Sequence, residues 1–293
     1  MSTLTEILSP SFLLRDALIG SVLVGLVCPL VGAYFVLRRM IFLGVALPQL
    51  SSAGIAFAFL VYRFAAGVHR HGELSERALA MVGSFVFTLA GLIVLAAFER
   101  RGRETVEARI GVTYAVAAAA TMLFLAADPW GEAQMVNLLK GDLLATTGTS
   151  LGVLIDLLGV VVLLLFLLRK EFLLVSFDRD LAIVFGKRVA LWDGLLYLLI
   201  GTTISIGVMT AGPMVTFGFL VVPPLTARLL TRRMLSFSLA AAAIGAASAF
   251  LGFYAAYRLD VPLGPAQVAV ASLALLLASG GRKLQLIARG RSA

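Results

Sequence analysis

Nine long apolar runs, separated by short polar connections, fill most of this 293-residue chain and limit what it can fold into. A run of about 20 apolar residues is long enough to cross the hydrocarbon core of a bilayer. Such runs must be helical there, because only a helix pairs its own backbone groups in lipid. We therefore expect an all-α polytopic membrane protein with spans at about 13–37, 41–62, 78–98, 110–127, 148–168, 189–208, 213–230, 235–257 and 264–280.

The composition excludes most soluble classes. Hydrophobic residues make up 60% of the chain and charged residues 14%, whereas soluble globular domains have about 45–50% apolar and about 25% charged residues. The single cysteine, Cys28, excludes an internal disulfide and a cysteine-based metal cluster, and we expect it to pack among apolar side chains. We expect one transmembrane domain over residues 1–293.

The basic residues indicate how the chain is oriented. If the spans alternate from a cytoplasmic Arg38-Arg39 loop, 18 of the 24 Lys and Arg residues lie on the cytoplasmic side and 6 on the other. Cytoplasmic loops carry such an excess of Lys and Arg. The distribution predicts an outside N-terminus, a cytoplasmic C-terminus and nine crossings. The net charge of +8 then reflects the orientation of the chain in the membrane. We expect membrane lipids, and no nucleic acid, as partners.

The second apolar run is the most polar of the nine. It contains Pro48, Gln49, Ser51 and Ser52. Proline removes a helical hydrogen bond and tends to kink the helix, and residues three apart share a helix face. We interpret the run as one wall of a translocation path; the alternative is a helix–helix contact held by small and hydroxyl residues.

Asp156 is the one carboxylate well inside an apolar run. A charge within a span is costly and often functional. In a functional interpretation Asp156 belongs to the translocation path or to a helix contact. In the alternative, it lies close enough to the outer surface for its side chain to reach water or a neighbouring hydroxyl. We expect Asp16 and Asp193, at the entrances of their spans, to be hydrated by the interface. A lone intramembrane charge disfavours a secondary transporter.

Catalytic and metal-binding signatures are scarce. The two histidines, His69 and His71, lie in one polar loop, where their spacing is a weak chelate. No phosphate-binding GxxxxGK[ST], GxSxG or HExxH motif occurs. We therefore expect a non-catalytic subunit, and ATP hydrolysis, if transport needs it, on another chain. A membrane enzyme is less favoured because the carboxylates are scattered.

Residues 169–188, between the fifth and sixth runs, predict a short helix outside the membrane. The Asp178 side chain can accept a hydrogen bond from a free N–H at its start, and Gly186 can end it in the left-handed conformation. The amphipathic residues between them suit either a lipid surface or the groove of a partner.

Three parts of the chain together carry a family resemblance. Residues 35–60 contain Arg-Arg-Met, a glycine and then a polar helix; residues 170–189 contain Lys-Glu, Ser-Phe-Asp and a later glycine. Residues 208–234 and 252–278 contain a proline-bearing helix and a Tyr-x-x-Asp-x-Pro-x-Gly-Pro loop. In this order they resemble the permease subunits of bacterial ABC-type importers for zinc, manganese and iron, over nearly the whole chain.

The resemblance implies a type II-like ABC importer permease in the bacterial cytoplasmic membrane, working by alternating access. Its partners would be a second copy or a related permease, cytoplasmic ATPase subunits that bind ATP and magnesium, and an external solute-binding protein. The helix beside the path would be broken or kinked at Pro213, Pro223 and Pro224. The residues of the helix that couples the permease to the ATPase would be Ser176, Phe177, Asp178, Asp180, Leu181, Phe185 and Gly186.

The chain departs from the family at the expected metal ligands. Zinc and manganese members carry Gly-Asp-Ala-Leu-x-His in the second helix, and here Val45 and Gln49 stand at the Asp and His positions. Valine binds no metal, and a glutamine carbonyl suits harder ions than an imidazole does. We therefore assign no metal ligand. Three explanations remain: a partner permease supplies the ligands, the ion passes hydrated or chelated, or the cargo is not a free transition metal but, for example, a metal chelate such as a siderophore.

Overall fold

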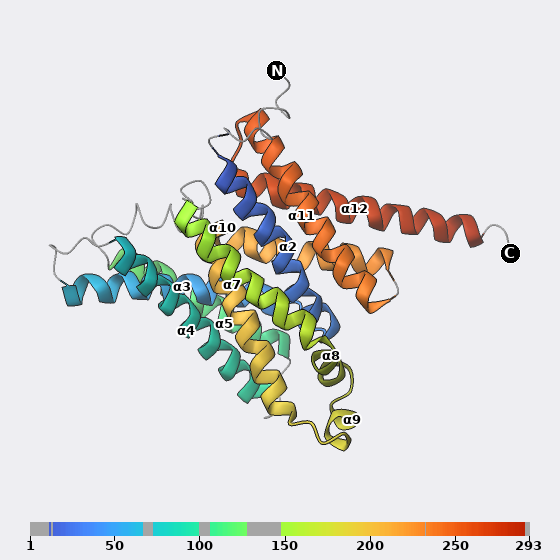
Figure 1. Ribbon diagram of the computed structural model, residues 1–293, viewed down its shortest axis with the longest axis horizontal. Coiled ribbons are helices and arrows are strands. Elements are labelled where there is room, and N and C mark those ends of the chain that lie inside the picture. Colours follow the sequence, from blue (N-terminus) through green and yellow to red (C-terminus); the bar gives the residue numbers. More distant parts are fainter. Residues whose placement is uncertain are drawn as a thin grey trace.

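The computed structural model describes residues 12, 14–66, 73–99, 106–127, 148–231 and 233–290. Within these ranges every regular element is an α-helix (Figure 1). The helices are α2 (Arg15–Leu37), α3 (Leu43–Ala66), α4 (Glu73–Glu99), α5 (Val106–Ala126), α7 (Gly148–Leu167), α8 (Arg169–Phe177), α9 (Arg179–Val184), α10 (Val189–Leu230), α11 (Met234–Leu259) and α12 (Leu263–Gly290). The prediction of an all-α polytopic membrane protein is confirmed.

Seven of these helices are long and apolar enough to cross a membrane. The α7–α8 pair is an eighth candidate, bent by 66° at Leu168. α10 counts once in this set, although its 42 residues cover two of the predicted spans. At about 1.5 Å per residue a helix of that length is roughly twice as long as the bilayer core is thick. The count of nine and the orientation of the termini stay predictions.

α10 is divided by a single residue. Gly212 has φ 81° and ψ 164°, outside the helical region, and separates two helical legs at 189–211 and 213–230. Glycine adopts positive φ without a Cβ clash. Pro213 begins the second leg, where its missing N–H is not needed. Pro223 and Pro224 lie farther along that leg and Pro48 lies inside α3, each surrounded by helix.

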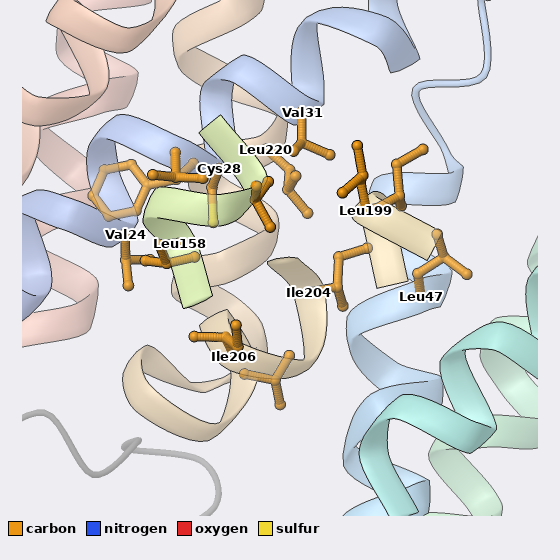
Figure 2. Packing of buried hydrophobic residues seen from close by; sticks show 14 of the residues in the cluster. Val24, Cys28, Val31, Leu47, Leu158, Leu199, Ile204, Ile206 and Leu220 are labelled. Carbon is orange, nitrogen blue, oxygen red and sulfur yellow. The ribbon is translucent and has the colours of Figure 1, made fainter. Parts of the chain in front are cut away.

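The core forms around α2, which packs against both α10 and α11. Val24, Cys28 and Val31 of α2 point into a cluster that also contains Leu158 of α7 and Leu220 of α10 (Figure 2). Cys28 is buried there among apolar side chains, as expected from the sequence. The α3 helix joins this core on one side and packs against α4 and α5 on the other.

Glycines bring several helices into backbone contact. A Cβ at Gly32 of α2 would collide with the Leu220 carbonyl of α10, and a Cβ at Gly54 of α3 or at Gly83 of α4 would collide with the carbonyl of the other glycine. Small residues allow such close approach between membrane helices, where packing replaces the hydrophobic effect. The relative positions of α2 and α10 therefore leave no space for a side chain at Gly32.

A single methyl group at this contact tests the packing. We expect Gly32→Ala to destabilise the protein by about 3 kcal/mol, because the two backbones must separate. Gly111→Ala in α5, another apolar helix but with nothing within 4 Å of the added Cβ, is the matched control. Thermal unfolding of the detergent-purified variants measures both. Equal stability of the two variants would contradict the close α2–α10 contact.

Candidate coupling and translocation site

The segment after α7 is anchored by aromatic side chains. Phe172 of α8 is fully buried and packs edge-on against Tyr34 of α2 and Trp192 of α10, at ring-centroid distances of 6.1 and 6.0 Å. Edge-to-face pairs of this kind add to the energy of burial. α8 is thus held against the ends of two membrane helices, and it fixes where the next helix begins.

α9 has the two caps that its sequence predicts. The Leu181 N–H donates to Asp178 Oδ1 at 2.9 Å, which satisfies a free donor at the helix start. At the other end Gly186 has φ 71°, and the Lys187 N–H donates to the Ala182 carbonyl at 3.0 Å. This is the pattern of a Schellman motif. The two caps thereby stabilise a helix of only six residues, which is too short to be stable on its own.

The surface of α9 is largely apolar and uncovered. Ala182 is its buried residue, and Asp180 is exposed. Figure 1 shows α9 at one end of the molecule, beyond α8. An apolar patch outside the long helices is typical of a protein contact. The large apolar side chains on and beside α9, exposed by 42% to 80%, are Phe177, Leu181, Ile183, Val184 and Phe185.

A buried ion pair connects α9 to the membrane helices. Arg38 Nη2, just after α2, lies 2.8 Å from Asp193 Oδ1 near the start of α10, although the approach is not aligned as a hydrogen bond. Arg179 of α9 donates to Asp193 Oδ2 at 2.9 Å. The Arg38 Nε–H donates to Ser176 Oγ of α8 at 3.0 Å. One carboxylate and one guanidinium thus link four helices.

The expectation that the interface hydrates Asp193 is wrong. Its relative exposure is 9%, because Arg38 and Arg179 cover it. The opposite charges of Arg38 and Asp193 at the ends of two spans were visible in the sequence. Nothing in their spacing, however, indicated that α2 and α10 meet there.

The hydroxyl groups of α3 are used in packing. Ser51 Oγ lies 2.6 Å from Ser84 Oγ of α4, and the Ser52 hydroxyl donates to the Pro48 carbonyl at 3.1 Å. Both serines are fully buried. The contact with Ser84 favours the helix–helix alternative for Ser51, whereas the Ser52 hydrogen bond stays within α3. Val45 and Gln49, one turn apart on α3, remain partly exposed, so the helix still offers a carbonyl group at its surface.

Asp156 lies on the outward face of α7. Its side chain is exposed among apolar neighbours that include Val153, Ile155 and Val160. It does not join Gln49 or the α3 serines in one site within this chain. Among the described residues no group of three or more His, Cys, Asp or Glu is placed to hold a metal ion. His69 and His71 lie outside the described residues.

Comparison with known proteins agrees with this helical arrangement. Residues 11–281 match the ABC 3 transport family. The chain belongs to this family. It is therefore a membrane subunit of an ABC transport system, with a transport role rather than a catalytic one.

Relatives of known description cover nearly the whole chain. The manganese transport system membrane protein MntC of Listeria monocytogenes is 27% identical over 90% of this chain and 89% of its own length. A probable iron transport system membrane protein of Haemophilus influenzae is 27% identical over 95% and 93%. The structure of PsaBC from Streptococcus pneumoniae in complex with Fab aligns with a TM-score of 0.79 at 23% identity, covering 94% of both chains. That last likeness shows a shared fold.

The buried ion pair can be tested with two charge-removing variants. Asp193→Asn leaves Arg38 buried without its counter-charge, so we expect a loss of about 3–5 kcal/mol in the free energy of unfolding. Arg179→Gln removes the outer partner, whose side chain is 52% exposed, and should cost less than about 1 kcal/mol. Thermal unfolding in detergent measures both. A similar small loss in the two variants would show that the inner pair does not hold the helices.

Proposed function

We propose that this chain is the permease subunit of an ATP-driven importer for a divalent metal ion in the bacterial cytoplasmic membrane. The observation that carries the proposal is α9: a capped helix with an exposed apolar surface, tied through Arg179 to the buried Arg38–Asp193 pair. A helix that docks an ATPase needs an accessible surface and a rigid link to the membrane helices. Family membership supports the same role.

The assembly that we propose has two permeases, identical or related. Two cytoplasmic ATPases bind ATP and magnesium, and an external solute-binding protein delivers the cargo. Residues 169–188 form the coupling segment, with Ser176, Phe177, Asp178, Asp180, Leu181, Phe185 and Gly186 as its surface and caps. ATP-driven closure of the ATPases would shift α9 and alternate the access of a path beside α3 and the broken α10. The named relatives are transport-system membrane proteins for manganese or iron.

We favour manganese as the cargo, because a relative that covers most of the chain is a manganese transport system membrane protein. Gln49 offers a neutral carbonyl at a partly exposed position of α3, and oxygen ligands suit manganese better than zinc. Val45 stands at the family's aspartate position and binds no metal. A chelated metal is therefore the second candidate for the cargo. In that case the chain contacts organic groups of the chelator rather than the ion itself.

The coupling role of α9 is tested through its cap. Asp178→Ala removes the acceptor for the Leu181 N–H and should destabilise the helix by about 1 kcal/mol. We expect weaker stimulation of the ATPase by the loaded binding protein in proteoliposomes. Asp178→Asn is the matched control, since asparagine caps as well as aspartate. Full coupling in both variants, or a loss only in Asp178→Asn, would contradict the assignment of α9.

The cargo is tested by reconstituting the chain with its ATPase and binding protein. We expect manganese to stimulate ATP hydrolysis and to be taken up, with a smaller response to zinc. Gln49→Leu should lower manganese uptake about tenfold, which is the effect of losing one polar contact with a charged group. Leu50→Ile is the control, because it leaves the carbonyl of Gln49 in place. A response only to chelated metal would select the second candidate. No response to any metal would remove the cargo assignment.

A further inference from the structure

Three arginines converge on one pocket at the α9 end of the helices. Arg39 follows α2, Arg228 lies in the last turn of α10, and Arg233 precedes α11. They line a cavity of about 540 Å³ together with the hydroxyl-bearing Ser176 and Thr231. Among the described residues no carboxylate lines this pocket or pairs with these arginines. The pocket therefore attracts an anion that this part of the chain does not supply.

A second cavity, of about 560 Å³, is almost wholly apolar. It lies between α2, α7, α8 and α11, and its lining includes Leu26, Leu30, Val162, Leu165 and Leu239. Arg169 and Lys170 add two cations where α7 ends and α8 begins. The Arg169 guanidinium lies 5.0 Å from the Phe166 ring centroid, which holds it over the apolar wall.

The two cavities follow one another along the same helices. Met234 at the start of α11 lines both. On α8, Leu173 lines the apolar cavity and Phe177, four residues later, lines the cationic pocket. On α2, Tyr34 lines the apolar cavity and Leu37, three residues later, lines the cationic pocket. Residues three or four apart share a helix face. An apolar channel thus continues into a cationic pocket at the end of a membrane helix.

We propose that the two cavities together bind one anionic phospholipid. Its phosphate would lie in the pocket of Arg39, Arg228 and Arg233, and an acyl chain would lie in the apolar cavity. Arginine forms paired, charge-assisted hydrogen bonds with phosphate, and basic pockets between membrane helices select anionic headgroups. A free anion would use only one cavity. An acidic protein surface would leave the apolar cavity uncovered.

The place of the site suggests what the lipid does. The phospholipid contacts α8, which leads directly into α9, and also α11 on the opposite wall. A bound lipid braces α8 against the helix bundle. The position of α9 then depends on anionic lipid, separately from the identity of the cargo.

The test is lipid binding by the full-length purified chain. Native mass spectrometry gives its affinity for phosphatidylglycerol and for phosphatidylcholine. Arg228→Gln with Arg233→Gln should weaken phosphatidylglycerol binding about 25-fold, because each basic residue near the headgroup contributes roughly fivefold. Arg282→Gln with Lys283→Gln, exposed on α12 outside both cavities, removes the same charge and should change affinity less than about twofold.

The apolar cavity is tested on its own. Ser238→Phe fills it and should weaken binding of the acyl chain, whereas Ser236→Phe adds the same ring to an exposed position of α11 outside the cavities. Leu239→Ser, a milder change in the same wall, should act in the same direction. Excess inorganic phosphate should leave the lipid bound.

Four results would overturn the proposal. Equal affinity for both lipids would remove the headgroup preference, and displacement by inorganic phosphate would indicate a simple anion site. Unchanged lipid binding with lost ATPase co-purification, in the Arg228→Gln and Arg233→Gln variant, would assign the pocket to the ATPase. A change of the dimer fraction rather than of lipid binding in Ser238→Phe would assign the apolar cavity to a second copy.

Discussion

The buried contact between Arg38 and Asp193 fixes how the ends of α2 and α10 meet. Either charge alone, removed from water at this depth, would be strongly destabilising, so neither can leave without the other. Sliding one helix along the other by a turn would separate the two charges. This would cost on the order of several kcal/mol. Ser176 and Arg179 bind to the same two side chains and bring α8 and α9 into the same arrangement.

This contact also gives α9 a direct path to the membrane interior. In the first leg of α10 the helix rises roughly 28 Å between Asp193 and the break at Gly212, at about 1.5 Å per residue. The close approach of α2 at Gly32 lies beyond this break, at Leu220 of the second leg. In the proposed importer a displacement of α9 is carried by a rigid helix across most of the membrane. It arrives at Gly212, where the backbone leaves the helical conformation and the second leg, packed against Gly32 of α2, begins.

Local features of the chain were predictable from its sequence, and contacts between distant segments were not. The apolar runs predict the membrane helices, and Asp178 and Gly186 predict the two ends of α9. Each of these predictions needs only residues that are neighbours in the sequence. Asp193 looked like a hydrated residue, since its burial depends on Arg38, which lies far earlier in the chain. The contact between Ser51 and Ser84 was equally invisible in the sequence, because Ser84 lies on another helix.

Asp156 supplies a physical reason for the second permease in the proposed assembly. A carboxylate facing lipid near the middle of a span costs about 2.5–3.5 kcal/mol, yet Asp156 is exposed on an apolar face of α7 and has no described partner in its own chain. Gly152 and Gly159 flank it on the same helix, each with open space where a Cβ would be. Small residues let another helix approach closely enough to donate a hydrogen bond. Covering this face with a second permease would remove the carboxylate from lipid, which a monomer cannot do.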